Sequence, residues 1–253
     1  MTNLELVELL GATSGVVCCV GAGGKKSTLY RLAGAHRGRV GITATAHIEH
    51  FPQALHAASV VATGAALLAG VAARSERHRV VAFAKPCSLP GRHLGVDFDE
   101  LAALQAAGGF GLLLVKADGA RSRILKAPAA HEPALPPKVE TVIPVCSIHA
   151  LGELLSERIA HRPEQVAVIT GLQLGEILRP AHLARLLSSP DGALRGVGSA
   201  RVIPLINMVD DLALERQAVQ VAEAALAATS RYDYIVLASL RHPTNPVVRV
   251  VHR

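Results

Sequence analysis

Short apolar runs alternate along this chain with longer segments in which apolar residues recur at helical spacing. The runs predict buried strands at residues 16–20, 40–43, 60–61, 80–84, 112–117, 141–145, 202–206, 234–239 and 247–251. The longer segments predict helices at about 26–35, 97–107 and 212–228, and three helical segments between residues 148 and 187. Alternating strands and helices are typical of a mostly parallel sheet covered on both faces. We therefore predict an α/β fold with a doubly wound sheet, in a single domain over residues 1–253.

Composition narrows the possible ligands and the location. Half of the residues are hydrophobic, and 26 Lys and Arg against 20 Asp and Glu give a net charge of +6. This favours acidic ligands, but the basic residues are scattered and lack an aromatic stacking platform, so we expect no nucleic-acid partner. Residues 1–10 carry two glutamates and no basic segment, and no apolar stretch is long enough for a bilayer. We expect a cytoplasmic protein whose four cysteines are reduced and buried.

The strand predicted at 16–20 leads into a glycine-rich turn and then a helix. The turn reads Gly21-Ala22-Gly23-Gly24-Lys25, and Lys26, Ser27 and Thr28 follow it. Glycines let backbone N–H groups approach phosphate oxygens, and the helix N-terminus favours negative charge there. A lysine adds positive charge, and a hydroxyl can ligate Mg²⁺. The segment predicts a P-loop NTPase-like site for a nucleoside triphosphate with Mg²⁺.

The spacing of this turn departs from the usual G-x-x-x-x-G-K-[ST] pattern. It is closer to a shorter G-x-x-G-K form, in which Lys25 binds phosphate and Lys26 replaces the metal-binding serine or threonine. Ser27 or Thr28 is then the candidate hydroxyl. A purely structural turn and a dinucleotide site are the alternatives, although the dinucleotide pattern G-x-G-x-x-G is missing here.

Further polar residues are predicted at the carboxyl ends of other strands, where open α/β sheets bind ligands. Asp118 follows the run 112–117 and is a candidate Mg²⁺ ligand, with a structural Asp-Gly turn as the alternative. Thr43 and Thr45, at the end of the run 40–43, are candidate contacts to phosphate or metal-bound water. After Asp118, the chain gathers candidates for binding the γ-phosphate or an anionic second substrate, namely Arg121, Arg123, Lys126, His131 and Glu132.

The run 202–206 ends in Asn207-Met208-Val209-Asp210, which resembles the N-K-x-D motif of GTPases. There the aspartate accepts hydrogen bonds from two donors on guanine. Adenine presents a different pattern of donors and acceptors at this position. The aspartate would then keep unpaired oxygen atoms, at a cost of roughly 1 to 3 kcal/mol. The pattern favours GTP slightly over ATP. However, Met208 replaces the usual lysine, and N-x-x-D is also a common helix N-cap.

These motifs occur together in one known family. The segments are 21–25, 43–48 (Thr-Ala-Thr-Ala-His-Ile), 117–121 (Ala-Asp-Gly-Ala-Arg), 126–133 (Lys-Ala-Pro-Ala-Ala-His-Glu-Pro), 161–164 (His-Arg-Pro-Glu) and 207–210. The chain resembles the YqeC family, accessory proteins of selenium-dependent molybdenum hydroxylases, over nearly its whole length. The block 118–133 is the most specific part. The resemblance implies a P-loop-like nucleotide-binding fold and a role in preparing a selenium-containing molybdenum cofactor or inserting it into an apo-enzyme. Lys26 departs from the family, which has Thr or Ser there.

Three functions are compatible with these residues. In the first, a nucleoside triphosphatase acts as a maturation factor: the turn 21–24 cradles the phosphates, Lys25 neutralises them, and Ser27 and Asp118 hold Mg²⁺. Asp210 then reads the base, and Glu132 or His131 orients the attacking group. The second is a kinase or nucleotidyl transferase in which Arg121, Arg123 and Lys126 bind a phosphorylated or pterin-type acceptor. The third is a non-hydrolysing adaptor switched by bound nucleotide, which the lysine at position 26 favours.

Overall fold

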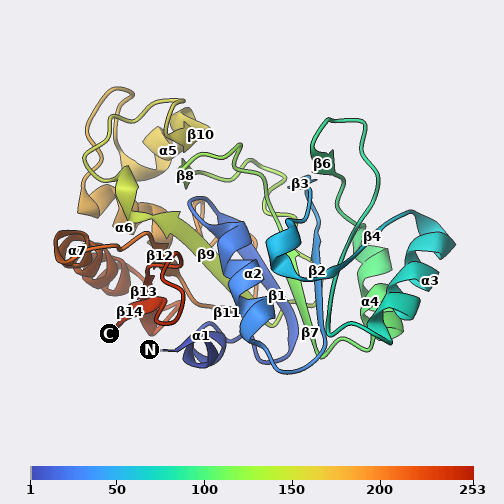
Figure 1. Ribbon diagram of the computed structural model, residues 1–253. Coiled ribbons are helices and arrows are strands. Elements are labelled where there is room, and N and C mark those ends of the chain that lie inside the picture. Colours follow the sequence, from blue (N-terminus) through green and yellow to red (C-terminus); the bar gives the residue numbers. More distant parts are fainter. Residues whose placement is uncertain (1) are drawn as a thin grey trace.

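A ten-stranded sheet runs through the computed structural model, which describes residues 2–253 (Figure 1). The strands lie in the order β14-β13-β12-β9-β1-β7-β2-β5-β4, and β11 pairs with β9 beside this path. All pairs are parallel except β13 with β14. The strands are β1 (Gly15–Gly21), β2 (Val40–Ala44), β4 (Ala58–Val61), β5 (Val80–Ala84), β7 (Leu112–Lys116), β9 (Thr141–Ser147), β11 (Arg201–Val202), β12 (Leu205–Asn207), β13 (Tyr234–Ala238) and β14 (Val247–His252).

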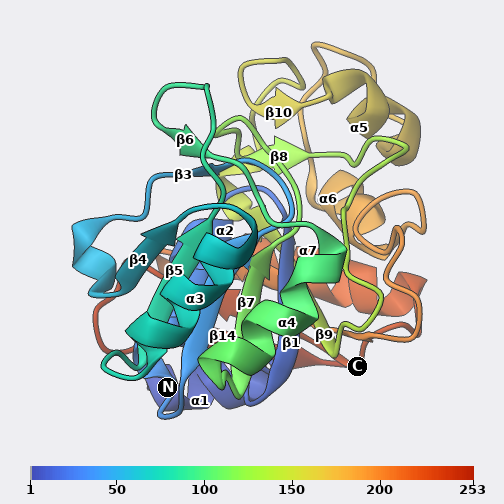
Figure 2. The ribbon, with the colours of Figure 1, turned by 90° about the vertical axis from the view of Figure 1, so that its right-hand side faces the viewer.

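Helices cover both faces of this sheet because its central strands are apolar on both sides. Val17 and Cys19 of β1 pack in one core with Leu29 of α2 (Lys25–Ala35), and α1 (Asn3–Leu9) lies on the same face. Val16 and Cys18 belong to the opposite core. That core includes residues of α3 (Gly64–Ser75), α4 (Phe98–Gly108), α5 (Pro163–Thr170), α6 (Pro180–Ser188) and α7 (Leu212–Ala228). Figure 2 brings α3 and α4 to the front. The predicted doubly wound α/β fold is confirmed.

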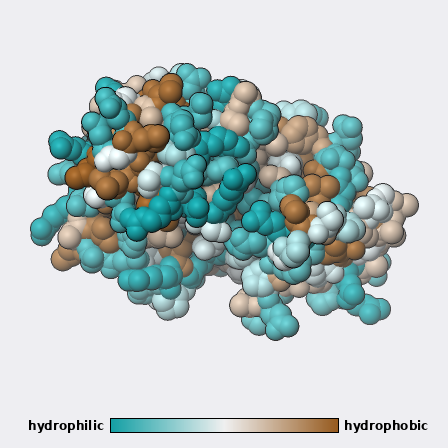
Figure 3. Space-filling view, turned by 90° about the horizontal axis from the view of Figure 1, so that it is seen from above, coloured by the Kyte–Doolittle hydropathy of each residue, from teal (hydrophilic) through white to brown (hydrophobic). Residues whose placement is uncertain are grey.

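The carboxyl ends of the parallel strands form the edge that carries the site. Strand β1 lies between β7 and β9, so the end of β1 is flanked by the ends of both neighbours. Two small sheets lie at this edge, at the top of Figure 1: β3 (Ile48–Glu49) with β6 (Arg92–His93), and β8 (Leu125–Lys126) with β10 (Ala160–His161). Seen from this side, hydrophilic side chains cover the centre of the molecule (Figure 3).

The predicted elements are present, with three differences. The run 202–206 is split into β11 and β12 by residues 203–204, where Pro204 has no N–H for a ladder hydrogen bond. Of the three helical segments predicted between 148 and 187, the first is only a 3₁₀ turn, η2 (Ile148–Ala150), and the other two are the helices α5 and α6. Helices α1 and α3, the 3₁₀ turn η1 (Gln53–Leu55) and the four two-residue strands of the small sheets were not predicted.

Two further expectations concern membrane-spanning segments and the burial of the cysteines. Within residues 2–253, no helix has the length and apolar character needed to span a bilayer. All four cysteines are free thiols; Cys18, Cys19 and Cys146 are buried as expected, whereas Cys87 is only half-buried.

Candidate functional site at the carboxyl edge of the sheet

The glycine turn between β1 and α2 is closely packed against the end of β9. Gly21, Gly23 and Gly24 all have positive φ, at 89°, 81° and 142°. A Cβ at Gly21 would lie 2.3 Å from the carbonyl oxygen of Val145, and one at Gly23 would lie 2.6 Å from Cβ of Ser147. Only glycine fits these positions, both because of the backbone angle and because of the lack of space. The turn is thus held in one shape by its neighbours.

Asn207, at the end of β12, ties this turn to the second predicted motif. Its Nδ2 donates a hydrogen bond to the carbonyl oxygen of Gly23 at 2.9 Å, and its Oδ1 accepts one from the N–H of Leu240 at 3.2 Å. The side chain is buried, and a Cβ at Gly24 would lie 2.3 Å from Nδ2. Asn207 therefore supports the turn from behind. Asn207 does not line the large cavity that is described below.

Lys25 and Asp118 form a buried ion pair at the mouth of the turn. Lys25 Nζ lies 2.7 Å from Asp118 Oδ1, and both side chains are at most 5% exposed. Lys25 also donates to the carbonyl oxygen of Gly21, and the N–H of Gly21 donates to Asp118 Oδ2 at 2.8 Å. Burial lowers the pKa of Lys25, against the opposing effect of Asp118. The predicted phosphate lysine and the predicted aspartate are therefore direct neighbours, although 93 positions separate them in the sequence.

The pair extends into a chain of alternating charges. Lys126 Nζ lies 2.9 Å from Asp118 Oδ2 and 2.8 Å from Glu132 Oε2, and Arg162 Nη1 lies 2.7 Å from the same Glu132 oxygen. Burial alone would raise the pKa of Glu132. The hydrogen bond and charge of Lys126 outweigh it and lower that pKa to about 2. We call Lys25, Asp118, Lys126, Glu132 and Arg162 the ion network.

A cavity of about 720 Å³ opens beside the turn and the ion network. Its lining combines residues 22–27 with the loop after β2, the end of β7 and the segment 119–124. Six lining residues are lysine or arginine and two are glutamate: Lys25, Lys26, Arg92, Lys116, Arg121, Arg123, Glu49 and Glu132. Such a cavity is large enough for a nucleotide, and its excess positive charge suits an anionic ligand.

Lys116, the last residue of β7, is a buried lysine in the wall of this cavity. It is 8% exposed, and its Nζ donates a hydrogen bond to the carbonyl oxygen of His47 at 2.7 Å. Within residues 2–253 no carboxylate lies within 4 Å of this ammonium group. Burial first, and then the charge of Lys25, lowers the pKa of Lys116 to about 7.

Four hydroxyl groups were predicted as candidate contacts to phosphate or the metal; two of them line the cavity and two lie in the protein interior. Ser27 and Thr45 line the cavity, although the Thr45 hydroxyl already donates to the carbonyl oxygen of Ala134 at 2.6 Å. Thr28 and Thr43 are fully buried, and their hydroxyls donate to backbone carbonyl oxygens of Gly24 and Phe83. Lys26 lines the cavity and pairs with Glu49 of β3. Of the four hydroxyls, Ser27 is therefore the most available to a ligand.

Asp210 lies apart from the cavity lining, in its own set of contacts. Its Oδ1 accepts a hydrogen bond from Ser239 Oγ at 2.5 Å and lies 3.1 Å from Arg241 Nε. The neighbouring Met208 does line the cavity and has a positive φ of 66°. Within residues 2–253, the other carboxylate oxygen, Oδ2, has only His149 Nε2 at 3.9 Å beside it. A base read by Asp210 would therefore enter beyond Met208.

A second cavity of about 310 Å³, lined by three arginines and two glutamates among other residues, adjoins the first. The two share Arg121, Arg123 and His161, and the second adds Arg162 at the start of α5. Burial, followed by the charge of Arg162, lowers the pKa of His161 to about 4, so its ring is neutral at pH 7. His131 and Glu132 line only the large cavity. The predicted acceptor residues Arg121 and Arg123 thus lie between two cavities, whereas Lys126 is enclosed in the ion network.

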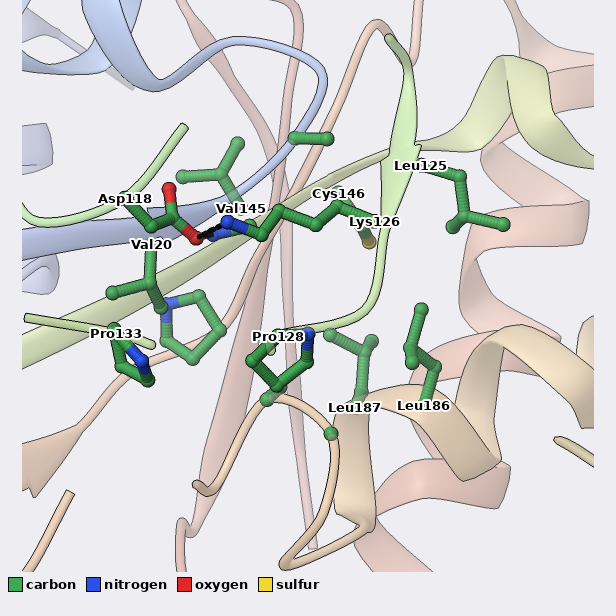
Figure 4. Close-up of a pocket in the computed structure, with 15 residues that line it drawn as sticks. Val20, Asp118, Leu125, Lys126, Pro128, Pro133, Val145, Cys146, Leu186 and Leu187 are labelled. Carbon is green, nitrogen blue, oxygen red and sulfur yellow. Dashed lines mark hydrogen bonds and ion pairs between the residues drawn. The ribbon is translucent and has the colours of Figure 1, made fainter. Parts of the chain in front are cut away.

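A small apolar pocket of about 40 Å³ lies on the other side of the ion network. Figure 4 shows Asp118 and Lys126 side by side at one wall, with Pro128, Pro133, Leu186 and Leu187 around them. Its size admits only one or two waters. This apolar wall limits solvent access to Asp118 and Lys126, and so strengthens their interaction.

Three residues of the site were missed by sequence reasoning. Lys116 stands inside a run that was interpreted as continuously apolar, and that interruption was the available signal. Arg162 lies in the segment 161–164 that carries the family resemblance, but it had no predicted role. Its contact with Glu132 joins residues 30 positions apart, which no local pattern indicates. Arg241 has no local pattern that would predict its contact with Asp210.

Magnesium, predicted with Ser27 and Asp118, has few other protein ligands here. Among residues 2–253, no group of three or more His, Cys, Asp and Glu is arranged to hold a metal ion. Both Asp118 oxygens contact ammonium groups, although Oδ1 accepts no hydrogen bond. Asp118 is 2% exposed and does not line the large cavity, whereas Ser27 does. An ion here would have Ser27 and at most one Asp118 oxygen, freed from a lysine, and would take its other ligands from phosphate and water, as Mg²⁺ does in many nucleotide sites.

Comparison with known proteins relates this chain to one family. The sequence model of a family described as "YqeC protein" matches residues 17–164. A protein of Escherichia coli (strain K12), described as "Uncharacterized protein YqeC", is 35% identical over 185 residues, which are 72% of this chain and 71% of that protein. The family match includes the glycine turn, Lys116 and the whole ion network, whereas Asn207 and Asp210 lie beyond it.

Proposed function

This chain belongs to the YqeC family, and on that premise we propose that it binds a nucleoside triphosphate, GTP or ATP, on the turn 21–25. We further propose that it uses the nucleotide as an accessory protein in the maturation of selenium-dependent molybdenum hydroxylases. Its partners would be the apo-subunit of such an enzyme or its cofactor. The observation that carries the nucleotide proposal is the buried Lys25–Asp118 pair at a glycine turn that opens on a cationic cavity.

Each residue of the turn then has a defined task. The N–H groups of Gly21 and Ala22 donate to Asp118 and Val145, so the N–H groups of Gly23, Gly24 and the start of α2 would face the phosphates. Lys25 would exchange part of its contact with Asp118 for phosphate oxygens. Ser27 and Asp118 would hold Mg²⁺, which adds positive charge to the phosphates when bound. Asp210, oriented by Ser239, would accept hydrogen bonds from guanine, and this favours GTP over ATP.

Hydrolysis would need a group that positions the attacking water. Glu132 and His131 both line the cavity. The Glu132 carboxylate is held by Lys126 and Arg162, so it stays ionised and can accept a hydrogen bond from water. His131 is exposed and free of these contacts. We therefore favour Glu132 for this role.

Calorimetric titration of GTP and ATP, with and without Mg²⁺, tests the proposal. We expect micromolar binding of one nucleotide. Lys25→Ala should weaken it by roughly 2 kcal/mol or more, because it removes a charged phosphate contact. Lys138→Ala, at an exposed lysine outside the site, is the matched control and should bind like the wild type. If a folded sample binds neither nucleotide, the proposal is wrong.

The paired cavities also favour a second candidate, a kinase or nucleotidyl transferase. An acceptor anion in the 310 Å³ cavity would meet Arg121 and Arg123 while the nucleotide occupies the larger one. Product analysis with labelled nucleotide distinguishes the two reactions. Label that leaves the nucleotide only when a small acceptor is added supports transfer, whereas release without acceptor supports hydrolysis.

A non-hydrolysing adaptor is favoured by one observation at position 26. Lys26 is engaged with Glu49 and supplies no hydroxyl for Mg²⁺. Tight binding without turnover, together with stable association with a hydroxylase subunit, would support this function over the first.

A further inference from the structure

Lys116 has no part in the functions assigned above, yet it is a buried lysine in the wall of the nucleotide cavity. It is 8% exposed and ends the central strand β7, at the edge of the sheet where ligands bind. Its neighbours in register are Cys19 of β1 and Ala44 of β2. Burying an ammonium group without a carboxylate partner is costly.

The direction of the side chain follows from the strand itself. Alternate residues of a strand share a face, and Leu112 and Leu114 pack with Leu29 of α2. Lys116 is two residues further along, so it leaves the sheet on the α2 side. This is the end of the sheet at which α2 begins with Lys25 and Lys26. Three lysines from two elements therefore surround one part of the cavity.

The three lysines differ in how their charges are matched. Lys25 is paired with Asp118 and Lys26 with Glu49. Lys116 donates one hydrogen bond to the carbonyl oxygen of His47, and no carboxylate of residues 2–253 lies within 4 Å of it. An anion in the cavity would favour the protonated form of Lys116, which has three N–H donors, so two remain for that ligand. The matching acceptor is an anionic oxygen.

We propose that Lys116 binds the terminal phosphoryl group of the nucleotide and thereby makes the site prefer triphosphates to diphosphates. The inference rests on the proposed nucleotide binding. The backbone of a phosphate turn surrounds the inner phosphates, whereas Lys116 comes from β7, outside the turn. Its ammonium group thus serves the phosphate that projects beyond the turn into the cavity. The carbonyl oxygen of His47 accepts a hydrogen bond from Lys116 and holds the side chain in place.

Calorimetric titration of GTP, GDP, ATP and ADP into the wild type and Lys116→Met tests this assignment. We expect Lys116→Met to weaken triphosphate binding about tenfold or more, as for loss of a charge-assisted hydrogen bond. Diphosphate binding should stay within about twofold. Lys116→Arg, which keeps the charge, should retain part of the preference, and Lys138→Met is the control for the change in net charge.

Thermal unfolding of the same variants separates binding from structure. Methionine replaces a buried, unmatched charge by an apolar side chain of similar length, so we expect an unchanged or higher Tm. A lower Tm together with equal losses for di- and triphosphates would overturn the proposal and show a structural role. Unchanged binding of all nucleotides by Lys116→Met would overturn it as well, and would leave the proposed function standing. If the wild type itself binds no nucleotide, the proposed function fails and this inference with it.

Discussion

The buried cations beside the nucleotide cavity fall into two groups that differ in how their charges are matched. In the ion network, each cation touches a carboxylate: Lys25 and Lys126 share Asp118, and Glu132 joins Lys126 to Arg162. Lys116, at the end of β7, is also buried but contacts only a backbone carbonyl. Matched charges hold a structure together in the absence of ligand. An unmatched charge is stabilised only by something that enters the cavity.

The comparison predicts that the ion network contributes to stability as well as to the site, whereas Lys116 contributes to ligand binding alone. Substitutions in the ion network should change the free energy of unfolding strongly, whereas Lys116→Met should change affinity and not lower stability. The following predictions test the matched group, from the largest expected effect to the smallest.

Asp118→Asn should have the largest effect, because it leaves Lys25 and Lys126 buried without their shared carboxylate. Loss of one partner of a buried ion pair costs about 3 to 5 kcal/mol. Urea unfolding measures this difference. The matched control is Asp191→Asn, which breaks an exposed pair with Arg195 and should cost less than about 1 kcal/mol. Similar values for the two variants would contradict the division between the two groups.

Glu132→Gln should destabilise the protein by about 1 to 3 kcal/mol at pH 7, since two cations lose a charged acceptor. The effect should depend on pH. The pKa of Glu132 is about 2 when folded, below its unfolded value, so its contribution is complete above about pH 4.5. It is lost as the pH falls from there toward 2. Unfolding measured along this range should show a shallower acid limb for the variant than for the wild type.

His161→Gln should change the pH dependence at a higher pH. The folded pKa of His161 is about 4, below the unfolded value near 6.5, so the unfolded chain takes up a proton first as the pH falls. The wild type should therefore lose stability between about pH 6.5 and 4, in addition to losses from other groups. Glutamine should remove this contribution. An identical slope for both proteins over this interval would show that His161 is not held neutral.

Lys26→Met should have the smallest effect on stability. Lys26 and Glu49 are 36% and 48% exposed, and such pairs contribute less than about 1 kcal/mol. If nucleotide binding also stays unchanged, Lys26 takes no part in phosphate binding. A loss of affinity without loss of stability would place Lys26 with Lys116 in the ligand-binding group.

The fold was predictable where the chain carries a strong local pattern. The apolar run before Gly21 and the helical spacing after Lys25 predicted β1 and α2 to within one residue. Helix α3 was missed because Gly64–Ser75 is rich in alanine and leucine with little polar contrast between its faces. The strands β3, β6, β8 and β10 have two residues each, too few for any periodicity.

The site was predictable by residue type but not by contact. The turn and Asp118 were placed correctly at the carboxyl edge of the sheet, since strand ends meet there. Their functional roles stay predictions. The pairing of Lys126 with Asp118 and of Arg162 with Glu132 could not be predicted, because it depends on how β8 and β10 fold back over the sheet. The isolation of Lys116 is also a property of the folded chain alone.

The hydrogen bond from Asn207 to Gly23 has a consequence for the order of events during synthesis. The two residues are 184 positions apart, a stretch that a ribosome needs roughly 10 to 40 s to add at about 5 to 20 residues per second. Lys25, Asp118 and Glu132 all emerge before the residue that supports the turn from behind. A nascent chain therefore carries the charged groups of the site well before the turn is complete. Competence to hold a ligand is one of the last properties the protein acquires as it leaves the ribosome.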